Sequence, residues 1–342
     1  MPLQLPVVLS GAPGSPYTRK MLAILRYRHI PYRFLLSRSA AAARLPKPKV
    51  QLLPTFYLAN DGEELEAITD STPIIRRLER ELDGRSVIPD SPALAFIDEL
   101  IEDYADEWLT KAMFHYRWSY AADVRRAGAT LPCWGEYSIP NEVLAERVEA
   151  ISERQIGRLG VVGSNATTGP VIEASYRRFL EAFEAHLTVQ PFVLGARPAA
   201  CDFAIFGQLS QLAGFDPTPM ALASDLAPRV FAWVTMMEDQ SGLEPGELEW
   251  MSLDPPSPTL KALLAEIGRV YPSVMLANAK ALAEGEIEVR ATVDGKSWTQ
   301  APFPYQAKCL QWLRASHAAL DPASRVEIDS VLNSTNLMPL LA

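Results

Sequence analysis

Hydrophobic and polar positions in the first part of the chain predict alternating strands and helices. The apolar run "PVVLS" at 6–10 ends in a glycine loop, and "YTRKMLAILRYRHI" at 17–30 then places its apolar residues on one helical face. "PYRFLLSR" at 31–38 predicts a second strand. Two strands joined by a helix in this way are expected to be parallel.

The following segments predict two further strands and a helix. "TFYLA" and "ELEA" flank Asn60-Asp61-Gly62, a strong hairpin turn signal. "DSTPIIRRLERELD" at 70–83 opens with capping residues and a proline, which is typical of a helix start. The order βαβ followed by ββα predicts a thioredoxin-like domain over 1–86, which ends near a proline- and glycine-punctuated linker at 83–92.

Residues 93–250 have a helical pattern throughout. The stretch 93–118 is long and amphipathic, and 173–187 carries one apolar stripe. Residues 201–212, "CDFAIFGQLSQL", are nearly all apolar, so we expect this helix at the buried centre of a bundle. "GVVGSNATTG" at 160–169 lacks the terminal Lys-Ser/Thr of a phosphate loop and is interpreted as a loop between helices.

The last segment, 255–342, follows the boundary "DPPSP" and has a different pattern. We expect a helix over 259–283, a hairpin that turns at Asp294-Gly295, and two helices around 304–333. This small α+β extension has no function that the sequence reveals.

Length, composition and charge narrow the function classes. A chain of 342 residues is longer than a single hydrophobic core usually accommodates, so we expect two domains. Its composition, with 48% hydrophobic and 21% charged residues, is ordinary for a globular protein. The net charge of -9 argues against nucleic acid and membrane partners. The N-terminus lacks a basic start and no apolar run is long enough for a signal peptide or membrane span, so we expect a cytoplasmic protein.

Cysteine and histidine usage gives no sign of a disulfide framework or a metal site. The cysteines lie far apart without a C-x-x-C motif, and the histidines show no metal-ligand spacing. The residues concerned are Cys133, Cys201, Cys309, His29, His115, His186 and His317.

The segment "GAPGSPYTRKML" at 11–22 carries the first candidate chemistry. Its glycines let the loop approach a ligand closely, and Ser15 stands before a proline at the first helical turn. Arg19 and Lys20 are unfavourable near a helix N-terminus, which indicates an anionic neighbour. A solvated basic face is the alternative.

Four segments in this order resemble those of a known family: "GSPYTRKML", "LLPTFYL", "DSTPIIRRLE" and "PFVLGARPAACDFAIFGQL". On these motifs the chain is identified as a member of the cytosolic glutathione S-transferase superfamily, of a bacterial type with a C-terminal extension. The resemblance implies an N-terminal thioredoxin-like, glutathione-binding domain over 1–86 and an all-helical domain over 93–250. It also implies glutathione as co-substrate, a small-molecule electrophile and a homodimer.

The resemblance also implies a binding site for glutathione. Ser71 and the free backbone N–H groups of its helix would bind the γ-glutamyl carboxylate, and Asp70 would meet the α-amino group. The alternative is that both residues only cap the helix. Gln51 or Lys49 would reach the glycyl carboxylate.

Pro54 stands where the family has a cis peptide. That peptide would present the backbone of Leu53 to the cysteinyl part of glutathione, like an added strand. The alternative is a trans proline that opens an edge strand.

Ser15 stands where the resemblance places the group that activates the thiol. A free thiol has a pKa of about 8.5, and lowering it by about two units needs roughly 2.7 kcal/mol, which a hydrogen bond to the thiolate and a helix dipole can supply. Ser15 could instead serve only as an N-cap, and Tyr17 offers a second hydroxyl. The loop has no cysteine, which favours conjugation over reduction, although some serine-bearing members reduce disulfides.

The electrophile is expected between the domains, against the helix at 93–118. Tyr104 and Trp108, at i and i+4, are the predicted pocket residues, and core packing is the alternative. In the helix at 201–212, Ala199 replaces the usual Ser/Thr of the capping box, and Asp202 is expected to cap the helix through backbone N–H groups.

Three functions are compatible with the sequence. The first is a glutathione transferase that acts on a small apolar electrophile. The second is a glutathione-dependent disulfide or peroxide reductase on the same site. The third is a non-catalytic scaffold in which the extension is the binding element.

Overall fold

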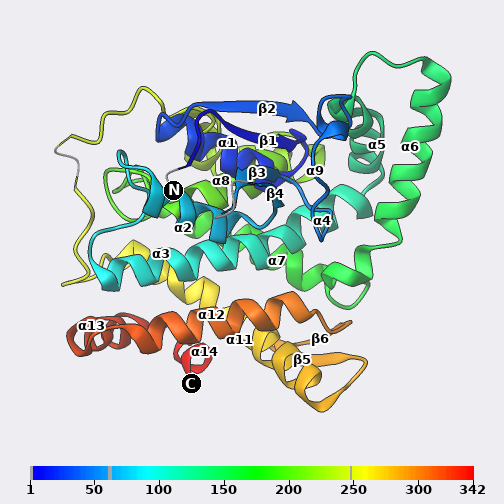
Figure 1. Ribbon diagram of the computed structural model, residues 1–342. Coiled ribbons are helices and arrows are strands. Elements are labelled where there is room, and N and C mark those ends of the chain that lie inside the picture. Colours follow the sequence, from blue (N-terminus) through cyan, green and yellow to red (C-terminus); the bar gives the residue numbers. More distant parts are fainter. Residues whose placement is uncertain (1–2, 61–63, 247–248) are drawn as a thin grey trace.

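The structure is a computed structural model that describes residues 3–60, 64–246 and 249–342. Three layers stack in Figure 1: the N-terminal sheet with its helices, a central group of helices, and residues 255–342 along the far side. We call this last segment the extension. Two residues of the predicted hairpin turn, Asp61 and Gly62, lie outside the described residues.

The N-terminal segment has the predicted thioredoxin-like arrangement. Its sheet has the order β2-β1-β3-β4, with β1 and β2 parallel and β3 antiparallel to both β1 and β4. Since β3 is an interior strand, Pro54 does not open an edge strand, and the Leu53–Pro54 peptide is cis. The elements are β1 (Val7–Gly11), α1 (Pro16–Tyr27), β2 (Tyr32–Leu36), η1 (Ala42–Arg44), β3 (Thr55–Ala59), β4 (Leu65–Ile68) and α2 (Ser71–Glu81).

The central segment is helical, as predicted, but its first helix is not continuous. The stretch predicted as one helix over 93–118 is interrupted by η2, a π-helical segment of five residues. Such segments occur often at functional sites. The elements are α3 (Pro92–Tyr104), η2 (Ala105–Leu109), α4 (Thr110–Ser119), α5 (Ala121–Gly135), α6 (Asn141–Ile156), η3 (Leu159–Val162), α7 (Gly169–His186), α8 (Ala200–Leu212), α9 (Pro217–Leu226) and α10 (Pro228–Met237).

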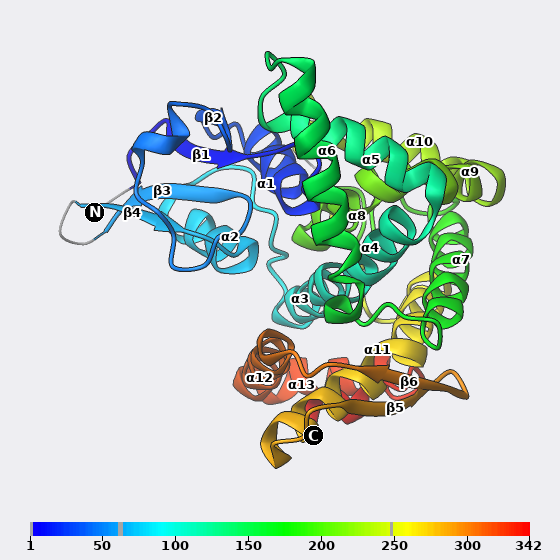
Figure 2. The same ribbon diagram turned by 90° about the vertical axis from the view of Figure 1, so that its right-hand side faces the viewer.

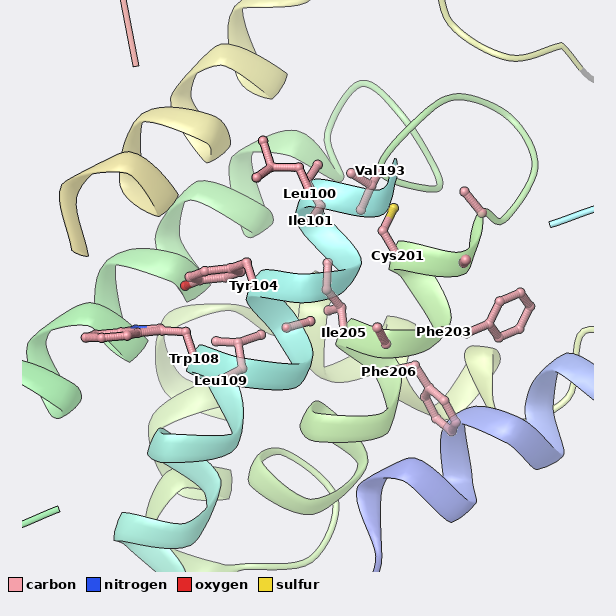
Figure 3. Packing of buried hydrophobic residues seen from close by; sticks show 14 of the residues in the cluster. Leu100, Ile101, Tyr104, Trp108, Leu109, Val193, Cys201, Phe203, Ile205 and Phe206 are labelled. Atoms are coloured by element: carbon pink, nitrogen blue, oxygen red, sulfur yellow. The ribbon is translucent and has the colours of Figure 1, made fainter. Parts of the chain in front are cut away.

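Helix α8 is the buried centre that its apolar sequence predicts. All of its residues are buried, and it packs against α1 on one side and α3 on the other. In Figure 3 the ring of Phe206 points towards α1. Asp202 accepts hydrogen bonds from the backbone N–H groups of Ala199 and Val193, both at 2.9 Å, so the expected capping by Asp202 is confirmed.

The extension packs on the helical segment rather than forming a separate core. Helix α11 lies against α7, while α12 and α13 lie against α3 (Figure 2). Buried residues of all three segments belong to one hydrophobic cluster. The predicted hairpin turns at Asp294 and Gly295, both with positive φ. The elements are α11 (Pro258–Glu284), β5 (Val289–Val293), β6 (Lys296–Gln300), α12 (Pro304–Ala319), α13 (Pro322–Leu332) and α14 (Met338–Leu341).

Among the described residues, no helix has the length and apolar character that a membrane span requires.

Candidate functional site

Ser15 lies at the meeting point of two N-terminal segments. Its Oγ caps α1 by accepting the N–H of Thr18 at 3.3 Å, and it donates to the carbonyl oxygen of Leu53 at 3.2 Å. The serine hydroxyl therefore touches the backbone of the cis-proline segment directly. The proposed thiol-activating group and the proposed backbone partner of the ligand are brought together.

The loop before Ser15 is held by the helical segment. Arg117 on α4 donates from Nη1 to the carbonyl of Gly14 at 3.0 Å, and Gln211 on α8 donates from Nε2 to the carbonyl of Pro13 at 3.1 Å. Arg117 is itself fixed by buried Asp216, with both carboxylate oxygens 3.0 Å from Nε. Because these side chains are buried and paired, the position of the loop depends on the second segment.

Tyr17, the alternative thiol-activating residue, has its hydroxyl engaged elsewhere. The hydroxyl donates to the backbone carbonyl of Asp106 in η2 at 2.8 Å. Burial raises the pKa of this phenol well above its ordinary value, and the nearby carboxylates of Glu107 and Asp106 raise it further. The Ser15 hydroxyl also donates to a backbone carbonyl, but that carbonyl belongs to Leu53, the predicted backbone partner of the ligand.

Ser71 begins α2, as predicted, and lies buried beside a cation. Lys20 donates from Nζ to Ser71 Oγ at 3.1 Å, and also to Glu102 Oε1 at 2.7 Å and Asp106 Oδ2 at 2.6 Å. Burial alone would lower the pKa of the Lys20 ammonium, but the two carboxylates outweigh it and raise that pKa. Lys20 is thus charged, and its positive charge lies next to the α2 N-terminus.

The cations at the start of α1 have anionic neighbours within the protein itself. Arg19 pairs with Glu238, and Lys20 pairs with the two acids on α3 and η2. Lys20 is 1% exposed, so a solvated basic face is the wrong interpretation for it. Its buried charge is compensated by carboxylates more than 80 residues away in the sequence.

Asp70 precedes α2 in an unusual backbone conformation. Its φ of 86° and ψ of 110° are rare for a residue other than glycine, and such outliers cluster at functional sites. Its Oδ2 accepts a hydrogen bond at 2.7 Å from the hydroxyl of Tyr305, on α12 of the extension. Asp70, Ser71 and Leu53 are the predicted ligand contacts that this part of the fold presents.

Two rows of acids on the first helix of the central segment were not recognised from the sequence. Asp98, Glu102 and Asp106 recur at every fourth residue, as do Glu99, Asp103 and Glu107. Glu102 and Asp106 of the first row meet Lys20 and Asp98 accepts the backbone N–H of Cys201, whereas the second row faces the extension. Acids at i, i+4 and i+8 on an otherwise apolar helix were the signal that could have revealed these rows.

The second acidic row has mostly neutral partners. Asp103 accepts from the Tyr271 hydroxyl and Glu99 from Ser316 Oγ. Burial raises the pKa of Glu107, in this row, to about 7, and it raises that of Asp106, in the first row, to about 6. A cavity of about 30 Å³ lies between this helix and α12, lined by five carboxylates, Thr72 and residues of α12.

The predicted electrophile pocket residues are in the core, so this prediction is wrong. Tyr104 and Trp108 are 0% and 1% exposed. Their rings point towards α7 and α11, on the side opposite to α1 (Figure 3). The ring of Tyr104 contacts that of Tyr271, and the ring centroids of Trp108 and Trp298 are 5.2 Å apart. The extension therefore buries the face that these aromatic residues form.

The remaining predicted residues lie at the surface. Lys49 and Gln51 are exposed in the stretch before the cis-proline, and no side-chain hydrogen bond among the described residues fixes them near Ser15. A broad hollow of about 880 Å³ lies elsewhere, between residues 157–165, the end of α11 and the β5–β6 hairpin. In the part of the chain that the structure describes, no group of three or more histidines, cysteines or acids is arranged to hold a metal ion.

One family model matches the N-terminal segment. Residues 9–86 match the model of the family described as glutathione S-transferase, N-terminal domain. No curated protein sequence matches the chain.

Several solved structures are similar to this chain at low identity and with TM-scores below 0.5. One is a glutathione transferase family member from Pseudomonas fluorescens Pf-5 with two glutathione molecules bound (14% identity, 68% of this chain and 92% of that chain, TM-score 0.40). Another is a Tau class glutathione S-transferase from mango, Mangifera indica (17% identity, 75% of this chain and 95% of that chain, TM-score 0.39). A third is a maleylacetoacetate isomerase from Methylobacterium extorquens AM1 with bound malonate and glutathione (17% identity, 70% of this chain and 99% of that chain, TM-score 0.36).

Proposed function

We propose that this chain, whose residues 9–86 match the model of the glutathione S-transferase N-terminal domain, belongs to that superfamily and is a glutathione transferase. Glutathione would bind along Leu53, Asp70 and Ser71 and react as a thiolate with a small apolar electrophile. The observation that carries the proposal is the contact of the Ser15 hydroxyl with the carbonyl of Leu53 at 3.2 Å. It sets the Ser15 hydroxyl beside the backbone that would pair with the cysteinyl residue, and on ligand binding its one proton would turn from the Leu53 carbonyl to the thiolate.

The arrangement around Ser71 suits a carboxylate. Ser71 Oγ accepts its hydrogen bond from Lys20, so the serine proton remains available to donate to a ligand. The first backbone N–H groups of α2 lack partners within the helix and carry partial positive charge. The charge of Lys20 is balanced by Glu102 and Asp106, so the N–H groups of α2 and the Ser71 hydroxyl are what favour the γ-glutamyl carboxylate at this place.

In the proposed reaction, glutathione loses its thiol proton and the electrophile loses a leaving group. The thiol loses its proton to solvent, and a hydrogen bond from Ser15 together with the α1 N-terminus stabilises the thiolate. A new carbon–sulfur bond then forms with the electrophile, whose leaving group departs with its bonding electron pair. Ser15 itself gains and loses no atoms.

Substitution of Ser15 tests this role. Ser15→Ala is expected to raise the pKa of bound glutathione, read from thiolate absorbance against pH, and to lower kcat with an activated aryl halide about 10- to 100-fold. Affinity for glutathione, measured by titration calorimetry, should change much less. Equal small losses in turnover and affinity would refute the assigned role.

Ser91 provides a matched control. It caps α3 by accepting the N–H of Leu94 at 3.4 Å and also precedes a proline at the first turn. Ser91→Ala therefore removes the same kind of cap away from the proposed site. It should cost similar stability and leave turnover unchanged.

Other assays separate the alternative functions. Turnover of a low-molecular-weight disulfide by glutathione, with no conjugation, would support the reductase instead. Absence of glutathione binding at 10 mM would correspond to less than about 3 kcal/mol of affinity and would favour the scaffold.

We further propose a homodimer in the cytoplasm. Because α12 and α13 cover α3, the dimer would use a surface outside that face. Sedimentation equilibrium of the full chain measures the oligomeric state, and a monomer at all concentrations would refute the dimer.

A further inference from the structure

Tyr305 connects the extension to the proposed ligand site. It lies in the first turn of α12, and its hydroxyl donates to Asp70 Oδ2 at 2.7 Å across 235 residues of sequence. The rare backbone conformation of Asp70 persists only where the surroundings hold it. The hydrogen bond from Tyr305 is one of the interactions that can do so.

The hydrogen bond leaves Asp70 able to bind a cation. An ionised carboxylate has about four acceptor positions on its two oxygens, and Tyr305 occupies one of them. Burial raises the pKa of Asp70, whereas the hydrogen bond from Tyr305 lowers it. The phenol therefore favours the charged, oriented form of Asp70 that an ammonium group needs.

Tyr305 is itself fixed by its own helix. The ring of Trp312 meets it edge-on, with centroids 6.3 Å apart, and Lys308 Nζ lies 4.2 Å from the Trp312 ring centroid. This face of α12 also closes the small cavity that Thr72 and the acids line. A volume of about 30 Å³ admits a group the size of water, which includes a primary ammonium.

One acid in that cavity is incompletely paired. Asp106 is 7% exposed, and its Oδ1 has no hydrogen-bond partner among the described residues. The cavity behind Tyr305 is therefore lined by carboxylates that are partly unsatisfied, and of the two cations near Asp70, Lys20 and Lys308, the first is already paired with Glu102 and Asp106. The carboxylate of Asp70 and those of the cavity favour a cationic ligand group on this side, whereas the Ser71 hydroxyl and the first N–H groups of α2 would face the ligand's carboxylate.

We propose that Tyr305 is a positioning residue that holds Asp70 for the primary ammonium of the ligand, so that the extension completes the site within one chain. The inference rests on the proposed function, in which Ser71 takes the neighbouring carboxylate. Together the two residues would recognise the zwitterionic α-amino-acid end of the ligand.

The test compares glutathione with its deamino analogue, in which hydrogen replaces the α-ammonium group. Tyr305→Phe should weaken glutathione binding about tenfold in titration calorimetry and leave binding of the analogue unchanged. Tyr271→Phe is the matched control, because it removes another phenol–carboxylate bond between the extension and α3. It should change neither affinity.

A second comparison isolates the interaction between Tyr305 and Asp70. In an Asp70→Asn background, Tyr305→Phe should have no further effect on glutathione binding. Unchanged or tighter glutathione binding by Tyr305→Phe, or equal losses for both ligands, would overturn the positioning role while the proposed function stands. A wild-type protein that binds no glutathione would overturn both.

Discussion

Replacing Lys20 by methionine should destabilise the protein strongly. Methionine keeps the unbranched apolar stem but removes the ammonium that bonds to Glu102, Asp106 and Ser71 within 3.1 Å. Both acids are buried, and Glu102 is 1% exposed. Removing one partner of a buried ion pair leaves an uncompensated charge and costs about 3–5 kcal/mol.

Two features of the structure refine this magnitude. Glu102 keeps Thr72 Oγ1 at 3.0 Å and Arg76 at 3.6 Å, so it retains compensation when Lys20 is lost. Asp106 keeps no comparable cation among the described residues, and it can avoid its buried charge by taking up a proton, because burial already raises its pKa to about 6. We therefore expect a loss near the lower end, about 3 kcal/mol, at pH 7.

Urea unfolding followed by circular dichroism measures the effect. The triple variant Lys20→Met, Glu102→Gln, Asp106→Asn should recover most of the loss, since no uncompensated charge remains. Lys47→Met, at an exposed position, is the control and should change the free energy of unfolding by less than about 0.5 kcal/mol. A loss below about 1 kcal/mol for Lys20→Met would refute the reasoning.

Two further predictions concern the extension. Gly268→Ala should lower the melting temperature by several degrees and expose the C-terminal end to limited proteolysis, because a Cβ there would lie 1.6 Å from the backbone oxygen of Thr335. A melting temperature equal to that of the wild type would contradict this close approach. Glu107→Gln should flatten the pH dependence of stability between pH 5 and 7. The folded-state pKa of Glu107 is raised to about 7, so its contribution is present below the unfolded value of about 4.3 and is lost as pH rises towards 7. Unfolding curves at several pH values give the slope of the free energy of unfolding against pH, and the exposed control Glu286→Gln should keep the wild-type slope. A wild-type slope for Glu107→Gln as well would refute the prediction.

Local patterns predicted the elements well. The strands end at turn residues, and α8 is nearly all apolar, so its composition predicts its central position. The start of α2 at Ser71 was predictable because capping residues and a following proline mark it. These features depend on neighbours in sequence, which is what a pattern records.

Side-chain pairing across the segments was not predictable in the same way. An apolar stripe shows that Tyr104 and Trp108 face a partner, but not whether that partner is a ligand or another helix. Here the extension supplies it. The pairing of Lys20 with Asp106 depends on η2 and on packing between segments, for which the sequence period carries no information.

The N-terminal site is shaped by residues that lie outside the N-terminal segment. Arg117 and Gln211 fix the loop before Ser15, and the acids of α3 and η2 fix Lys20 beside Ser71. The extension fixes Asp70 through Tyr305. Since one hydrophobic cluster joins all three segments, removing any of them would disturb packing as well as these contacts. Point substitutions that delete a single donor can therefore separate the role of each segment in ligand binding, whereas truncation cannot.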